Sequence, residues 1–102
     1  MPRPIIKQFE DIISANKTVA AEFTARWCDE CKSITPVFRK LSDQYPSITF
    51  VRIDVEKVGL LAQKYSVSYV PTFLFFKNGK KGDQLQGYSK RALEKKVSEL
   101  AA

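Results

Sequence analysis

Apolar residues recur along this chain with two different spacings, which predict strands and helices in alternation. A β-rich apolar run at 18–25 is typical of a strand covered on both faces, and further runs predict strands at 48–55 and 72–76. Apolar residues three and four positions apart predict helices at 9–13, 34–45, 58–65 and 93–100. A short run at 4–7 predicts one more strand ahead of the first helix.

Turn residues complete this pattern. Asn78-Gly79 is a strong hairpin signal, and the polar segment 80–86 after it is suited to a return strand at an exposed sheet edge. Pro46 ends the second helix, and Pro36 inside that helix is expected to kink it after two turns.

The resulting order, βαβαβαββα, requires crossovers between the early strands and a hairpin between the last two. It predicts an α/β fold with a central mixed sheet between two helical layers, a three-layer α/β/α sandwich. The 102 residues suffice for one hydrophobic core, so we expect a single domain over residues 1–102.

The composition excludes several classes of protein. With 44% hydrophobic and 27% charged residues the chain is typical of a globular domain. It has no apolar run of the ~18 residues that span a bilayer, and its start lacks the apolar core of a signal peptide, so we expect a cytoplasmic protein without membrane association. The net charge of +6 is spread along the chain without a run of four basic residues, which argues against nucleic-acid binding.

The two cysteines carry the chemistry. Cys28 directly follows a buried strand at the start of a helix, and Cys31 lies one turn further along. The unpaired N–H groups and the dipole of a helix N-terminus stabilise a thiolate, which is the nucleophile of disulfide exchange. A second thiol three residues on can then attack the mixed disulfide and release the product.

Two other interpretations of the pair are weaker. A closed zinc site would need carboxylates or a second chain, because the sequence has two cysteines and no histidine, so we expect no metal. Inert buried cysteines remain possible, but a Cys-x-x-Cys between a strand and a helix is typical of a redox pair.

Three separated motifs resemble those of thioredoxins. They are Ala-Arg-Trp-Cys-Asp-Glu-Cys-Lys at 25–32 with Pro36 after it, Val-Pro-Thr-Phe at 70–73, and Lys-Asn-Gly at 77–79. The resemblance covers nearly the whole chain and is strongest to cytosolic eukaryotic-type thioredoxins. It implies a thioredoxin fold and a protein-disulfide reductase that works by dithiol-disulfide exchange.

The resemblance also implies roles for individual residues. Cys28 would be the exposed nucleophile and Cys31 the buried resolving thiol. Trp27 would be a flat apolar flank for substrates, with core packing as the alternative.

The same resemblance assigns residues to the rest of the substrate-binding site. Pro71 would be cis, leaving the backbone of Val70 facing the cysteines and free to pair with an extended peptide, with an ordinary trans proline as the alternative. Gly87 and Tyr88 would line the opposite rim.

Glu22 interrupts an apolar strand, where an uncompensated carboxylate is costly. Thioredoxins usually have an aspartate here, six residues before the nucleophile, which helps to move protons on and off the resolving thiol. We therefore predict that desolvation raises the pKa of Glu22 and that it acts as general base for Cys31. The alternative is a buried ion paired with Arg52, which would lower that pKa again.

Asp29 and Glu30 stand where thioredoxins usually have Gly-Pro. Their charges suit the helix N-terminus but oppose a thiolate on Cys28. We therefore predict a reducing couple, near or below the value of about −270 mV for thioredoxin, and an effect of the acidic pair on partner choice.

The resemblance implies that the chain binds no cofactor and receives electrons from NADPH through a thioredoxin reductase. Its clients would be disulfide-containing proteins such as peroxiredoxin, methionine sulfoxide reductase and ribonucleotide reductase, and we expect a monomer. Two alternatives stay open. One is a thioredoxin-fold binding or redox-sensing module with slow turnover, and the other is a nucleic-acid binder that uses the basic surface.

Overall fold

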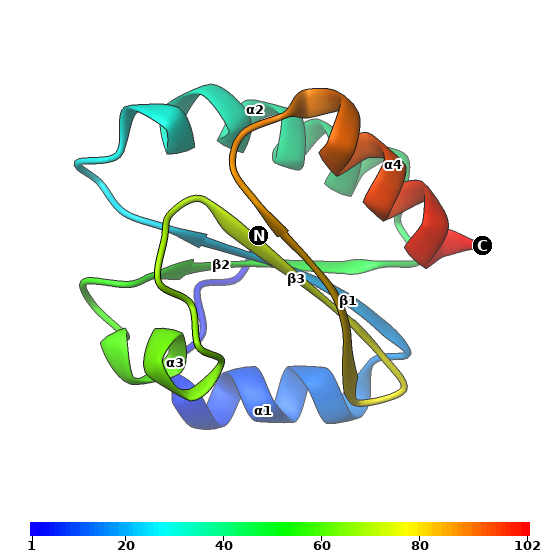
Figure 1. Ribbon diagram of the computed structural model, residues 1–102. Helices are drawn as coiled ribbons and strands as arrows, with labels where there is room; N and C mark the ends of the chain where they lie inside the picture. Colours follow the sequence, from blue (N-terminus) through cyan, green and yellow to red (C-terminus); the bar gives the residue numbers. More distant parts are fainter.

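Four strands form one mixed sheet in the computed structural model, which describes residues 1–102 (Figure 1). The strand order is β2-β1-β3-β4, with β1 parallel to β2 and antiparallel to β3, and β3 antiparallel to β4. In chain order the elements are α1 (Ile6–Ala15), β1 (Thr18–Thr24), α2 (Asp29–Gln44), β2 (Thr49–Asp54), α3 (Gly59–Lys64), β3 (Thr72–Lys77), β4 (Lys80–Gln86) and α4 (Lys90–Ala101).

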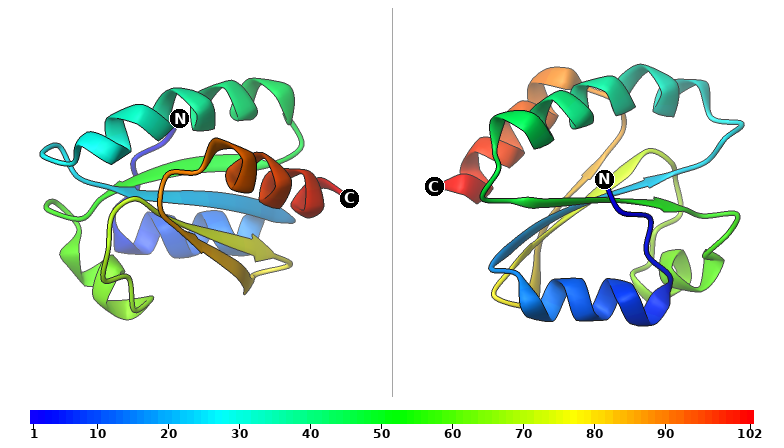
Figure 2. Two further views of the ribbon diagram at one scale, coloured as in Figure 1. Left: turned by 45° about the horizontal axis from the view of Figure 1, so that its top comes forward. Right: turned by 180° about the vertical axis from the view of Figure 1, so that it is seen from behind.

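Helices cover both faces of the sheet. Helices α1 and α3 lie on one face and α2 and α4 on the other, which confirms the predicted three-layer sandwich (Figures 1 and 2). Alternate residues of β1 belong to different cores: Phe23 packs in the core with α1 and α3, and Ala20 in the core with α2 and α4. All seven residues of β1 are buried, as predicted for a strand covered on both faces.

The strand predicted at 4–7 is wrong. Helix α1 begins at Ile6, and the Ile5 N–H donates to Gln8 Oε1 at 3.0 Å, which caps the first turn. The segment before it lies beside β2, where the Pro2 carbonyl accepts a hydrogen bond from Arg52 N at 3.0 Å. Pro2 and Pro4 have no N–H to donate, so this segment cannot form a regular ladder.

The predicted turn chemistry is present. Asn78 and Gly79 have φ of 53° and 81°, the two positive values of a tight turn that matches strand twist, and they join β3 to β4. Helix α2 continues through Pro36 and ends at Gln44, two residues before Pro46. None of the helices is long and apolar enough to cross a membrane.

Candidate active site

A disulfide joins Cys28 and Cys31 at the N-terminus of α2. Cys28 is the N-cap residue in extended conformation, and the Cys31 N–H donates to Cys28 Sγ at 3.1 Å. The sulfur therefore takes one of the free N–H groups of the first turn, as an N-cap oxygen does in other helices. The same N–H and the helix dipole would stabilise negative charge on Cys28 once the disulfide is reduced.

The expected exposure of Cys28 is wrong for this disulfide-bonded form. Cys28 is 2% exposed and Cys31 is 1% exposed. The Cys28 sulfur is covered because it lies 3.6 Å from the Val70 carbonyl oxygen and 3.8 Å from Glu30 Oε2. The Val70 backbone therefore faces the Cys28 sulfur, as predicted.

Backbone geometry brings the other predicted substrate-binding residues to this place. The Val70-Pro71 peptide is cis, as predicted, and the trans alternative is wrong. The Gly87 N–H donates to the Pro71 carbonyl at 2.9 Å, which places the end of β4 beside the cis peptide. Gly87 has φ of 102°, a conformation that favours glycine, and Tyr88 after it is exposed.

Aromatic side chains stand out from the surface around the disulfide. Trp27 is 66% exposed, so core packing of this residue is excluded. Tyr69, directly before Val70, is also exposed and was missed by the sequence analysis. Its position two residues before the predicted cis-proline, outside any apolar pattern, was the signal that could have found it.

The two acidic residues between the cysteines have different surroundings. Asp29 is 91% exposed and its carboxylate lies 3.7 Å from Lys32 Nζ, whereas Glu30 turns toward the Cys28 sulfur. The predicted opposition to a thiolate on Cys28 therefore belongs to Glu30. No three His, Cys, Asp or Glu side chains are grouped so that they could hold a metal ion.

Glu22 is fully buried and pointed at α2. Glu22 lies two residues after Ala20 on β1, so its side chain points to the same face of the sheet, toward the core under α2. Glu22 Oε2 accepts a hydrogen bond from Thr35 Oγ1 at 2.7 Å, and Thr35 lies one helical turn after Cys31. Glu22 Oε1 is 3.3 Å from Arg52 Nε, its register partner on β2, but these two buried atoms form no hydrogen bond.

Burial dominates the electrostatics of this carboxyl. Desolvation raises the pKa of Glu22 above its usual value, while the Thr35 hydroxyl and the Arg52 and Arg39 guanidinium groups pull it partly back. The predicted direction and the predicted partner Arg52 are both confirmed. Thr35 and Arg39 were missed by the sequence analysis, although their positions four and eight residues after Cys31 place them on the same face of the helix.

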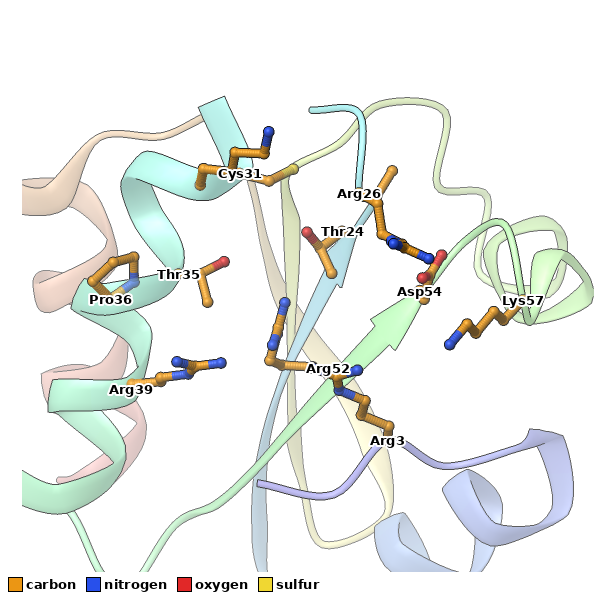
Figure 3. Close-up of a pocket in the computed structure, with 12 residues that line it drawn as sticks. Arg3, Thr24, Arg26, Cys31, Thr35, Pro36, Arg39, Arg52, Asp54 and Lys57 are labelled. Atoms are coloured by element: carbon orange, nitrogen blue, oxygen red, sulfur yellow. The ribbon is translucent and has the colours of Figure 1, made fainter. Parts of the chain in front are cut away.

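An open cavity of about 510 Å³ adjoins this part of the site (Figure 3). Cys31, Thr35 and Arg52 all line it, so it connects Cys31 and both partners of Glu22 with solvent. Water can therefore reach the neighbourhood of Cys31 from the side of the sheet edge, behind the disulfide.

A disulfide at a helix N-terminus, next to a cis-proline and above a buried carboxyl, defines a thiol-disulfide exchange site. Comparisons with known proteins agree. The sequence model of the family described as Thioredoxin matches residues 5–99. The chain is 42% identical over 95 residues to a thioredoxin H-type of Picea mariana, covering 93% of this chain and 76% of that one.

Solved structures show the same relationship. The chain is similar to the thioredoxin of Malassezia sympodialis, with a TM-score of 0.91 and 35% identity over 96% of this chain and 89% of that chain. It is also similar to a chain in a structure concerned with the thiol-resolving mechanism of yeast mitochondrial 1-Cys peroxiredoxin. That TM-score is 0.90, with 32% identity over 93% of this chain and 90% of that chain.

The chain belongs to the thioredoxin family and has the thioredoxin fold. It is a thiol-disulfide oxidoreductase with protein-disulfide reductase activity and a redox-active Cys-x-x-Cys pair. The Picea mariana and Malassezia sympodialis relatives are eukaryotic thioredoxins.

Proposed function

We propose that the whole chain, residues 1–102, acts as one reductase domain in which Cys28 is the attacking thiol. The observation that carries this role is the position of Cys28 as N-cap of α2, with the Cys31 N–H directed at its sulfur. The Cys28 thiolate attacks one sulfur of a client disulfide and forms a mixed disulfide, and the other client sulfur leaves as a thiolate.

Cys31 then resolves the mixed disulfide. Its thiol loses a proton and attacks Cys28 Sγ, so the second client sulfur leaves and the Cys28-Cys31 disulfide forms. The client has gained two electrons and, after protonation, two protons. Glu22 accepts the Cys31 proton, directly or through water in the adjoining cavity, because burial raises its pKa and makes it a stronger base than an exposed carboxylate.

Clients bind across the cis-proline. Val70 and Pro71 offer backbone groups to an extended peptide, and Trp27 and Tyr88 give apolar area on either side. Gly87 keeps the rim low enough for a peptide to approach, because it has no side chain.

The oxidised pair is returned to the dithiol by an NADPH-dependent thioredoxin reductase, and the chain itself binds no cofactor. Peroxiredoxins, methionine sulfoxide reductases and ribonucleotide reductase are the proposed clients. A peroxiredoxin client agrees with the structural relative that concerns peroxiredoxin resolution. The protein works as a monomer in the cytosol, although that relative concerns a mitochondrial system, and fluorescence imaging of the tagged chain tests the compartment.

Insulin-disulfide reduction with NADPH and a thioredoxin reductase tests the proposed mechanism. We expect turnover by the native chain, no turnover by Cys28→Ser or Cys31→Ser, and unchanged turnover by Ser33→Ala as the matched control. Only Cys31→Ser should accumulate a stable mixed disulfide with a client peptide, detected by mass spectrometry. A mixed disulfide on Cys31 in the Cys28→Ser variant would reverse the assignment.

Glu22→Gln tests the proton-transfer role. We expect a slower resolving step and an altered pH profile of turnover, with Glu94→Gln on the exposed face of α4 as control. An unchanged rate and profile would exclude the role.

The alternative of a binding or sensing module predicts activity that is weak with dithiothreitol as well as with the reductase. Activity with dithiothreitol but not with the reductase would mean that the chain is a protein-disulfide reductase whose electron donor is not thioredoxin reductase.

A further inference from the structure

The cavity beside Cys31 has a strongly basic lining, most of which has no role in the proposed disulfide exchange (Figure 3). Asp54 is the one carboxylate in the lining. The basic residues that line it are Arg3, Arg26, Lys32, Arg39, Arg52 and Lys57.

These side chains come from separate parts of the chain. Arg3 lies in the segment before α1, Arg39 is on α2, and Lys57 follows β2. In Figure 3 the Arg39 and Lys57 side chains extend from opposite sides toward the region where Arg3 and Arg52 lie. Folding therefore gathers these charges, which are dispersed in the sequence, around one hollow.

Most of these charges have no acidic partner. Elsewhere on the surface Lys64 pairs with Glu10, and Lys96 with Asp83. Within the cavity lining Arg52 pairs with buried Glu22 and Lys32 with Asp29. The remaining basic side chains have no carboxylate within 4.0 Å; they are Arg3, Arg26, Arg39 and Lys57.

Uncompensated like charges around a cleft repel one another and concentrate anions from solution. Guanidinium groups suit phosphate in particular, because their planar N–H pairs match two phosphate oxygens at once. The Thr24 hydroxyl on the cavity wall adds a neutral hydrogen-bonding group. A volume of about 510 Å³ has room for a small molecule but not for a folded partner.

We infer that this cavity is a binding site for a small anion carrying two or more phosphate groups. Inorganic pyrophosphate and the diphosphate of a nucleotide share the required chemistry. The inference does not depend on the catalytic roles proposed above, since it concerns charges behind the disulfide.

Titration of the oxidised protein with inorganic pyrophosphate at about 150 mM NaCl, where surface attraction is screened, tests this site. Calorimetry measures the affinity for pyrophosphate, and NMR amide shifts locate the bound pyrophosphate on the protein. We expect saturable binding with shifts centred on Thr24, Cys31 and Thr35. The double variant Arg39→Gln/Lys57→Gln should bind at least about tenfold more weakly, since each charged hydrogen bond contributes more than a kcal/mol.

The matched control is Lys80→Gln/Lys95→Gln, which removes the same charge from exposed residues outside the cavity. We expect its affinity to stay within about twofold of the native chain. Thermal unfolding of both double variants checks that they are folded.

Titration with ADP in place of pyrophosphate distinguishes inorganic pyrophosphate from the diphosphate of a nucleotide as the ligand. Equal affinity points to the phosphates alone, and tighter binding points to a nucleotide. Equal weakening of the two double variants, diffuse shifts, or no saturable binding would overturn the site.

Discussion

At the scale of single residues, Glu22 shows how burial and partners act against each other. The carboxyl has no exposed surface, yet it has a hydroxyl donor in Thr35 and a cation in Arg52. The raised pKa means that the loss of hydration outweighs both partners. Ionised Glu22 therefore costs the folded protein stability, and this cost has a defined pH dependence.

We predict that Glu22→Gln stabilises the protein at about pH 8 and that the gain disappears toward about pH 4. Between the ordinary pKa of Glu22 and its raised value the folded chain binds more protons than the unfolded chain. The free energy of unfolding therefore falls as the pH rises through this interval. Urea unfolding of both proteins at several pH values measures the difference. A variant that is less stable at alkaline pH would show that the Arg52 pairing dominates.

Of the two acidic residues between the cysteines, Glu30 is the one that affects the reduction potential of the Cys28-Cys31 pair. Its Oε2 lies 3.8 Å from Cys28 Sγ. In water such a distance corresponds to about 1 kcal/mol of repulsion toward a thiolate, which screening reduces further.

We predict that Glu30→Gln raises the reduction potential by roughly 20 mV or less, since about 30 mV corresponds to a tenfold change in the exchange constant. Asp29→Gln is the internal control, because Asp29 turns to Lys32 and should change the potential less. Equilibration with a glutathione or dithiothreitol redox buffer gives the values. A native potential above about −220 mV, in the glutaredoxin range, would contradict the predicted reducing couple.

At the scale of elements, α4 illustrates how a helix end is held by one side chain. Ser89 is its N-cap, and Ser89 Oγ accepts a hydrogen bond from Ala92 N at 3.1 Å. The helix packs Leu93 and Val97 on the core that it shares with α2. A frayed first turn would loosen this contact close to Tyr88 on the rim of the active site.

We predict that Ser89→Ala lowers the free energy of unfolding by about 1 kcal/mol, the usual cost of losing an N-cap. Ser98→Ala, on the exposed face of the same helix, should be neutral or slightly stabilising because alanine favours helix. Chemical denaturation of the two variants provides the comparison. Equal effects of the two substitutions would show that the hydrogen bond of Ser89 contributes nothing.

At the scale of the whole molecule, two separate cores hold the helical layers on the sheet. The core under α2 and α4 contains Phe38, whose ring centre lies 5.0 Å from that of Phe50 and 5.4 Å from that of Phe73. Phe38 has no exposed surface. It therefore fixes α2, and with it the cysteines at the start of α2, against two strands at once.

We predict that Phe38→Ala costs about 3 to 5 kcal/mol, because the surrounding side chains cannot fill the cavity that it leaves. For a domain of this size that loss corresponds to a drop in Tm on the order of 15 to 30 °C. Differential scanning calorimetry measures it. Tyr88→Ala, an exposed aromatic residue, is the control and should change Tm little. A small effect of Phe38→Ala would mean that the core repacks.

Much of the fold follows from local patterns in the sequence. The apolar run of β1, the Asn78-Gly79 turn and the helix-ending Pro46 each determine their neighbourhood through burial, backbone conformation or a missing N–H. The segment before α1 was wrongly predicted to be a strand. The short apolar run at 4–7 does not show whether a neighbouring strand can pair with the whole segment. A strand depends on the pairing of residues far apart in the chain, which local composition does not contain.

Cys28 and Cys31 could be recognised as a redox pair from local sequence alone, because they need only a strand end and one helical turn to come together. The sequence also singled out Glu22, because a carboxylate in an apolar strand is costly unless the fold compensates it. The surroundings of these residues became known only from the folded chain. The contact of Glu30 with Cys28, the hydrogen bond from Thr35 and the ring of basic side chains behind Cys31 depend on side-chain directions and on long-range packing, which no local spacing specifies.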